Sequence, residues 1–182
     1  VLSIPFCKRW FSTVEYYFSD EGEQATSSLK YRLTGTKTVE VAGIKEGRRR
    51  REETIIIPEK AIRDGYLFNV TSIGERAFYF CDGLTNVKIP SSVTEIGEYA
   101  FSGCSRLTCV EIPSSLTKIG SLAFSGCSGL TRVEIPSSVT EIGKGAFSGC
   151  SKLRIVKNQS SMTKISEYAF SGCSSMTSVE IP

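Results

Sequence analysis

The sequence predicts a solenoid, a stack of similar β-rich coils, rather than a globular domain with one closed core. The first observation is a cysteine that recurs every 23 residues, three positions after a phenylalanine each time. These cysteines are Cys81, Cys104, Cys127, Cys150 and Cys173. The second is that a whole unit recurs with them, reading Leu-x-x-Val-x-Ile-Pro-Ser-Ser-Leu-x-x-Ile-Gly-x-x-Ala-Phe-x-Gly-Cys over residues 107–127. Because stacked coils present an extended surface, function is expected on exposed columns rather than in a cleft.

Each coil is predicted to begin with a half-buried strand. In one unit, Leu84, Val87 and Ile89 alternate with the polar residues Asn86 and Lys88, which is the period of a strand. The proline that follows cannot donate to a strand ladder, so it ends the strand, and a Ser-Ser pair makes the corner.

A second short strand and a turn are predicted to complete the coil. Residues 93–96 fit the second strand. Gly97 then opens a short helical or 3₁₀ turn that carries Ala100 and Phe101 inward. One coil buries too little apolar surface to offset its loss of conformational entropy, so stacking has to stabilise it.

The recurring cysteines allow three interpretations. Neighbouring thiols could form disulfides, but parallel stacking holds the Cβ atoms about 5 Å apart, against the roughly 3.8 Å that a disulfide prefers. A thiolate metal site needs converging ligands, which a linear column does not provide. A small buried apolar side chain at the corner of each coil fits best. Only Cys7 and Cys109 then keep a possible chemical role.

Composition excludes several classes of function. Of 182 residues, 40% are hydrophobic and 23% charged, as in a folded soluble protein. A net charge of +3 is too small to indicate nucleic acid as a partner, and no apolar run is long enough to span a membrane. The chain has no histidine, which removes Ser-His-Asp and Cys-His catalysis and the commonest transition-metal ligand. We therefore expect no enzyme activity and no cofactor.

The repeated unit resembles a known family. Its pattern, Ala-Phe-x-Gly-Cys-x-x-Leu-x-x-Val-x-Ile-Pro-x-x-Val-x-x-Ile-Gly, is similar to BspA-type leucine-rich repeats, found in surface proteins of bacteria and some protists. The resemblance covers residues 69–182, expected to form about five coils. It implies a right-handed leucine-rich repeat solenoid that is secreted or attached to the cell surface and binds proteins of a host or neighbouring cell. The family brings no catalytic residues.

Residues 1–68 lose the period and are predicted to cap the first coil. Alternation in 29–33 and 38–41, with Gly35 between, predicts a β-hairpin. Pro58 resembles the proline of the repeat, yet Pro90 follows it by 32 residues rather than 23, so a nine-residue insertion is expected near 59–69 in a distorted first coil. Arg48 to Arg51 is interpreted as a solvated loop rather than a nucleic-acid or glycan patch, because glutamates flank it.

The outward residues of the first strands form the candidate binding face. One column is Asn86, Cys109, Arg132, Ile155 and Ser178, and the next is Lys88, Glu111, Glu134, Lys157 and Glu180. The candidate residues are Asn86, Lys88, Cys109, Glu111, Arg132, Glu134, Ile155 and Lys157. The apolar Cys109 and Ile155 mark either a contact patch or drift of the repeat at exposed positions.

Two further features concern the other positions of the coil. The second strands carry Glu95, Lys118, Glu141 and Lys164, whose alternating signs predict a salt-bridge ladder. Asn158 and Gln159 replace the Ile-Pro of the repeat, so that coil is expected to be bent or exposed.

The leading hypothesis is a non-catalytic, extracellular or cell-surface module that mediates protein–protein interaction or adhesion. The alternative is a structural spacer with no ligand of its own.

Residues 1–11 lack the features of a signal peptide, so we expect the chain to begin downstream of one. It ends at Ile181 and Pro182, partway through a coil, so we expect a fragment or a last strand that self-associates or meets another partner.

Overall fold

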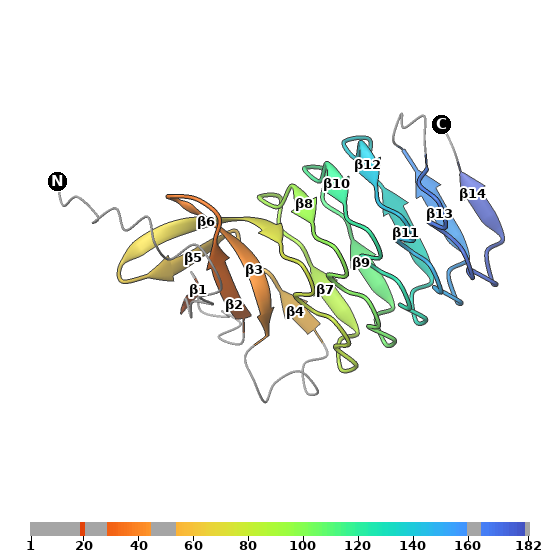
Figure 1. The fold of residues 1–182 in the computed structure, drawn as a ribbon, viewed down its shortest axis with the longest axis horizontal. Helices are drawn as coiled ribbons and strands as arrows, with labels where there is room; N and C mark the ends of the chain where they lie inside the picture. The colour runs from red at the N-terminus through yellow and green to blue at the C-terminus, as the bar shows by residue number, and fades with distance from the viewer. Residues whose placement is uncertain (1–18, 21–28, 45–53, 160–164, 181–182) are drawn as a thin grey trace.

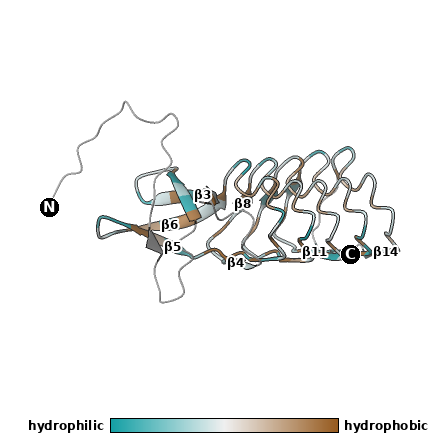
Figure 2. Cartoon of the chain, turned by 90° about the horizontal axis from the view of Figure 1, so that it is seen from below, coloured by the Kyte–Doolittle hydropathy of each residue, from teal (hydrophilic) through white to brown (hydrophobic). Residues whose placement is uncertain are grey.

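The computed structural model describes residues 19–20, 29–44, 54–159 and 165–180. It is built from strands, which follow one another along the long axis of an elongated molecule (Figure 1). Each of the three coils over residues 84–152 has a first strand, a corner at proline, a second strand and a turn-rich third side. Viewed from below, the coils lie side by side, with the amino-terminal sheet at one end (Figure 2).

The first strands form two parallel sheets. One contains β4 (Thr54–Ile56), β7 (Asn86–Lys88) and β9 (Cys109–Glu111), and the other contains β11 (Arg132–Ile135), β13 (Ile155–Asn158) and β14 (Ser178–Glu180). Val87 pairs with Val110, and Val133 with Val156, so partners are 23 residues apart. The 23-residue period of the sequence thus sets the register in which these strands pair.

The second strands form one continuous parallel path. It runs through β6 (Tyr66–Ile73), β8 (Glu95–Ile96), β10 (Lys118–Ile119) and β12 (Glu141–Ile142). Ile73 pairs with Ile96, and Ile119 with both Ile96 and Ile142. These isoleucines are buried, so the register that pairs the strands also stacks their inward side chains.

The amino-terminal strands extend this path. β2 (Leu29–Leu33) and β3 (Thr38–Ile44) form the antiparallel hairpin that the alternating pattern predicts. β3 pairs with β6 in parallel, and β5 (Lys60–Arg63) pairs with β6 in the antiparallel direction. β1 (Ser19–Asp20) pairs with β5.

The predicted insertion lies where the hairpin of β5 and β6 projects from the first coil (Figure 1). Beside it, Ile55 of β4 pairs with Val87 of β7, an offset of 32 residues instead of 23.

The third side of the coil differs from the prediction. No helical or 3₁₀ turn is found in the described residues, because neighbouring N–H groups point in different directions. The N–H of Ala100 donates to Gly97 within the coil at 3.3 Å, whereas that of Phe101 donates to Ala123 of the next coil at 2.7 Å. Tyr99 and Gly103 also have positive φ, of 54° and 77°. Helix formation needs every N–H to be donated backwards along its own chain, so this alternation excludes it.

The core consists of columns that run through the stack. The ring centroids of the successive phenylalanines are 5.0 to 5.4 Å apart, and the rings are nearly parallel. The column contains Phe78, Phe101, Phe124, Phe147 and Phe170. Stacking at this distance is an attractive geometry when the rings are offset. It lets each coil bury the aromatic side chain of its neighbour.

The recurring cysteines are free thiols, and four of the five are buried. The Sγ–H of Cys104 donates to the carbonyl of Phe78 at 3.0 Å, and that of Cys150 donates to Phe124 at 3.2 Å. Burial raises the pKa of the Cys104 thiol well above its usual range and that of Cys150 to about 12. Disulfides are therefore absent from this column, and the buried thiols pack as small, protonated side chains.

Candidate binding surface

The first strands present the candidate residues on one face. In β7 and β9 the central valine is buried and both of its neighbours are exposed. The exposed candidates are Asn86, Lys88, Cys109, Glu111, Arg132 and Glu134. Ile155 and Lys157 of β13 are half-buried. The face is thus most open over β7, β9 and β11.

The ladder of first strands is interrupted between β9 and β11. No strand pairing joins these two strands, although both lie within the described residues. The N–H of Thr131 still points to the carbonyl of Thr108, but over 3.4 Å. The equivalent bonds on either side, Thr108 to Thr85 and Arg154 to Thr131, measure 3.0 and 2.9 Å. The two three-stranded sheets therefore meet at a loosened junction.

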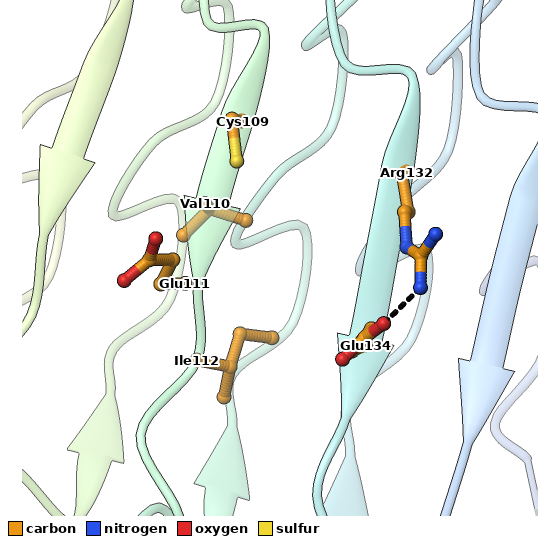
Figure 3. Close-up of a pocket in the computed structure, with 6 residues that line it drawn as sticks. All are labelled: Cys109, Val110, Glu111, Ile112, Arg132 and Glu134. Carbon is orange, nitrogen blue, oxygen red and sulfur yellow. Dashed lines mark hydrogen bonds and ion pairs between the residues drawn. The ribbon is translucent and has the colours of Figure 1, made fainter.

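A hollow of about 210 Å³ lies at this junction (Figure 3). It is lined by Cys109, Val110, Glu111, Ile112, Arg132 and Glu134. Val110 and Ile112 provide apolar surface, while exposed polar side chains of both strands lie around it. Four of the eight candidate residues, Cys109, Glu111, Arg132 and Glu134, line this hollow.

Sequence reasoning missed the hollow because a repeat register treats all coils alike. The nearest sequence difference, just before β11, does not mark it, because Gly83 stands at the same position before β7, whose pairing with β4 is intact. Gly129 stands where the neighbouring coils have Arg106 and Lys152. A Cβ on Gly129 would lie 2.7 Å from the carbonyl oxygen of Ser105, so the chain entering β11 approaches the previous coil more closely than a side chain allows.

The charges at the hollow are partly paired. The guanidinium of Arg132 forms an ion pair and a hydrogen bond with Glu134 on the same strand (Figure 3). The hydrogen bond from Arg132 holds the pKa of Glu134 below its usual range. Glu111, across the hollow, has no ion-pair partner within the described part of the chain, and its carboxylate is exposed. The rim therefore offers one neutralised pair and one available anion.

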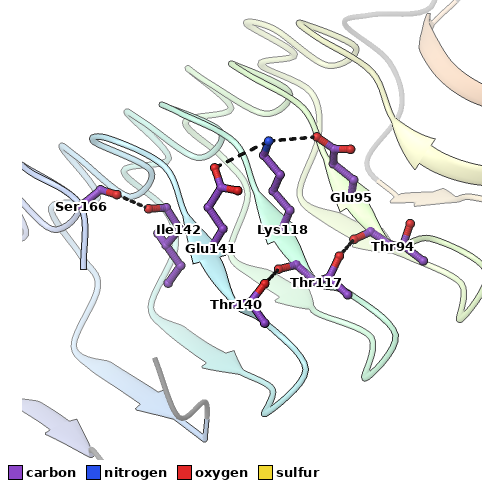
Figure 4. Close-up of polar contacts among 8 residues, drawn as sticks. All are labelled: Thr94, Glu95, Thr117, Lys118, Thr140, Glu141, Ile142 and Ser166. Carbon is purple, nitrogen blue, oxygen red and sulfur yellow. Dashed lines mark hydrogen bonds and ion pairs between the residues drawn. The ribbon is translucent and has the colours of Figure 1, made fainter. Parts of the chain in front are cut away.

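The second-strand side is occupied by contacts between coils. Lys118 Nζ lies 3.7 Å from Glu95 Oε1 and 3.6 Å from Glu141 Oε1, which confirms the ladder for these three residues (Figure 4). Lys164, its fourth predicted member, lies outside the described residues.

Threonine hydroxyls add a second row of contacts beside these ion pairs. Thr94, Thr117 and Thr140 each donate to the threonine carbonyl of the preceding coil, at 3.0 to 3.3 Å. Figure 4 shows the bonds that Thr117 and Thr140 donate. Side chains on this side are thus engaged within the stack.

The coil with Asn158 and Gln159 is not bent at the point predicted. Unlike proline, Gln159 has a backbone N–H, and it donates to the carbonyl of Ile135 at 2.9 Å. β13 consequently extends to Asn158, which is half-buried and pairs with Ile135. Gln159 itself is exposed, so the expected exposure is confirmed for that residue only.

Several predictions concern parts of the chain outside the described residues. They are Cys7, the run Arg48 to Arg51 and the ending at Ile181 and Pro182. Within the described ranges, no cluster of three or more acidic, cysteine or histidine side chains is placed to hold a metal ion. In the same ranges no helix has the length and hydropathy needed to cross a membrane.

Comparison with known proteins identifies the repeat. The model of the BspA-type leucine-rich repeat region matches residues 68–182 in six copies. A leucine-rich repeat protein from Bacteroides ovatus is 34% identical with a TM-score of 0.66; the match covers 85% of this chain and 46% of that one. This chain thus spans about half of that relative's length. A search of curated proteins found no match.

Two further solved structures are similar over most of the chain. The leucine-rich repeat protein of Treponema pallidum is 27% identical with a TM-score of 0.65, and the match covers 87% of this chain and 82% of that protein. A leucine-rich cell surface protein of Faecalibacterium prausnitzii is 26% identical with a TM-score of 0.60, with coverage of 92% and 54%. The same type of coil therefore recurs in proteins of Bacteroides ovatus, Treponema pallidum and Faecalibacterium prausnitzii.

Proposed function

Because this chain belongs to the family of BspA-type leucine-rich repeat proteins, we propose that it is a non-catalytic module, secreted or at the cell surface, that binds a protein through its first-strand face. The repeat suggests a protein-interaction module, and one relative is described as a cell surface protein. The absence of histidine from the sequence agrees with a module that binds without catalysing a reaction.

The observation that carries this proposal is the hollow between β9 and β11. Its volume of about 210 Å³ is below the roughly 300–1,000 Å³ of typical small-molecule sites. It suits a single apolar side chain of a partner, seated on Val110 and Ile112. Buried anchors of this kind dominate the affinity of many protein interfaces.

The polar rim supplies orientation. Arg132 and Glu134 form a pre-ordered pair on β11, and Glu111 of β9 also lines the hollow. Exposed charges contribute more to the association rate and to partner choice than to affinity. We therefore assign anchoring to the apolar floor and selectivity to the rim.

An array of extracellular proteins tests the proposal. The parent chain, Arg132→Ala and Lys157→Ala are compared, with Lys118→Ala on the second-strand side as the control. We expect Arg132→Ala to weaken capture of the bound protein, and Lys118→Ala to leave it unchanged. Equal capture by all four chains would exclude this face, and a parent chain that captures nothing would favour the structural spacer.

We also propose that residues 1–68 cap the stack. Pairing of β3 and β5 along β6 supports this role, because both strands cover backbone groups that would otherwise form an open edge. A chain without residues 1–53 is expected to self-associate, which size-exclusion chromatography would detect. A monomer with the parent's melting temperature would contradict the capping role.

A further inference from the structure

The third side of the coil contains one position that departs from its column. In four coils this position is a glycine with positive φ, between 71° and 77°: Gly103, Gly126, Gly149 and Gly172. In the coil before them it is Phe80, with φ of 52°. A left-handed backbone is unfavourable for a residue with a Cβ, and glycine avoids that cost. Phe80 is thus held in a strained backbone conformation that the glycines of the other four coils adopt without strain.

Burial does not compensate for this strain. The Phe80 side chain remains 58% exposed, the second-highest value among the large hydrophobic residues that the structure describes as exposed. Its ring lies over Gly103 of the next coil, where a Cβ would come within 2.8 Å of a ring carbon. The missing side chain of Gly103 therefore provides the space in which the ring rests. One part of the ring is supported by backbone, and the rest faces solvent.

Two tyrosines enlarge the exposed aromatic surface. Tyr79 meets Phe80 edge to face at 4.5 Å between ring centroids and meets Tyr99 at 6.1 Å. Tyr79 also departs from its column, because the following four coils have serine there. We call Tyr79, Phe80 and Tyr99 the aromatic cluster. Strained residues that stay exposed are typical of functional sites, and here two adjacent positions depart from the repeat together.

The charges beside the aromatic cluster are mainly negative. In the sequence, Glu75, Arg76 and Asp82 lie within five residues of Phe80, and Glu98 precedes Tyr99. Arg106 lies three residues after Gly103, on which the ring of Phe80 rests. Three carboxylates and two guanidinium groups leave one net negative charge. Arg76 is moreover paired with Glu75 at 3.0 Å. The surroundings therefore favour a positively charged partner.

Cations already lie on aromatic rings along this side of the stack. The guanidinium carbon of Arg76 is 5.2 Å from the centroid of the Tyr99 ring, and Lys144 Nζ is 5.3 Å from that of Tyr168, three coils further on. Both distances are typical of cation–π contacts. Phe80 has no such cation among the described residues, although its ring is the most exposed of the cluster.

We propose that the aromatic cluster binds an arginine or lysine side chain of a partner protein, on a side of the coil separate from the first-strand face. The cation would lie over the exposed ring of Phe80, with Tyr79 beside it and the neighbouring carboxylates opposing its charge. A neutral sugar could also stack on such a ring, but it would gain nothing from the net negative charge.

The test uses two matched peptide probes, acetyl-Gly-Arg-Gly-amide and the same peptide with citrulline in place of arginine. Citrulline keeps the shape of arginine and removes its charge. With the full chain carrying labelled phenylalanine and tyrosine rings, NMR titration follows the Phe80 signals. We expect the arginine peptide to shift them and to bind about two- to fivefold more tightly than the citrulline peptide, as for an exposed cation–π contact.

Phe80→Gly separates binding from folding, because glycine is the residue of the repeat at this position. We expect it to lose the arginine preference, followed through the Tyr79 and Tyr99 signals, while the melting temperature stays within about 4 °C of the parent. Tyr79→Ser, also a residue of the repeat, should weaken the preference too. Tyr168→Gly is the matched control in a distant coil and should leave the Phe80 titration unchanged.

Three results would overturn the inference. Equal binding of both peptides would remove the role of charge, and an unchanged preference in both Phe80→Gly and Tyr79→Ser would remove the cluster. Larger Phe80 shifts with cellohexaose than with the arginine peptide would indicate a glycan surface instead. None of these outcomes depends on the first-strand face, so the inference can fail while the proposed function stands.

Discussion

The two strand sides of the same coils differ in continuity. On the second-strand side, β6, β8, β10 and β12 pair without a break. Lysine, glutamate and threonine side chains there contact their neighbours at every described step from β8 to β12. On the first-strand side, the ladder stops between β9 and β11, and a hollow lies at the junction. One side of the molecule joins the coils, and the other leaves room for a partner.

This difference teaches that a repeat can separate structural and recognition roles within a coil. Positions that bridge coils must match their neighbours above and below, so they keep the pattern. Positions that face outward on the first strands carry no such requirement, and there Cys109 and Arg132 follow Asn86. Residue identity therefore varies most freely at the outward positions of the first strands, where a partner can contact it.

The largest expected effect comes from the core that both sides share. Phe124 is fully buried and stacks between Phe101 and Phe147 at 5.1 and 5.2 Å. Phe124→Ala should lower the free energy of unfolding by about 3–5 kcal/mol, because it removes both contacts and leaves a cavity. Chemical denaturation measures the loss. A change that loosens only one side in hydrogen exchange would contradict a shared core.

Alkaline pH should lower the free energy of unfolding through the buried thiols. Burial raises the pKa of Cys150 from 9.0 to about 12, so its stabilising effect is complete below pH 9 and is lost as pH rises toward 12. Between pH 8 and 10 the parent should lose about 1.4 kcal/mol more than Cys150→Ala does. Urea titrations at both pH values compare the two chains. Identical losses would indicate a thiol that ionises equally in both states.

Two equivalent valines of the first strands allow the intact and the interrupted parts of that ladder to be compared by their effects on stability. Val87 lies between paired strands, whereas Val110 borders the hollow. Val87→Ala should cost about 2 kcal/mol, and Val110→Ala about 1 kcal/mol less, since part of its surrounding is already empty. Thermal or chemical unfolding of the two variants decides this. Equal costs would mean that the junction packs as tightly as the rest.

The smallest effect is expected for the ion-pair ladder. Lys118 bridges Glu95 and Glu141, but all three side chains are at least 41% exposed. Lys118→Met should lower stability by only about 0.2–1 kcal/mol at low salt, and the difference should shrink as salt is added. Lys144→Met, at an exposed pair with Glu167, is the matched control. A large loss that persists at high salt would show that Lys118 contributes through packing instead.

Most of the coil could be predicted because its period fixes every register. Once Cys104 and Cys127 are aligned, the inward Phe101 and Phe124 and the paired Val87 and Val110 follow without further information. The same alignment predicted the ladder at Lys118, since partners one coil apart face each other.

Three features could not be predicted from the 23-residue period: the conformation of the third side, the hollow and the strained Phe80. Local propensity suggested a helical turn after Gly97, yet the positive φ of Tyr99 and bonds to the next coil prevented it. The hollow depends on the interruption between β9 and β11, which a pattern shared by all coils does not encode. The same holds for Phe80, whose strain is visible only against the glycines of its column.

Hydrogen exchange of three backbone amides tests the difference between the two sides most directly. The N–H of Thr131 spans the interruption at 3.4 Å, while those of Arg154 and Thr140 make bonds of 2.9 Å on the intact first-strand and second-strand ladders. We expect Thr131 to exchange at least about tenfold faster than the other two under native conditions. Equal protection of all three amides would contradict an open junction between β9 and β11.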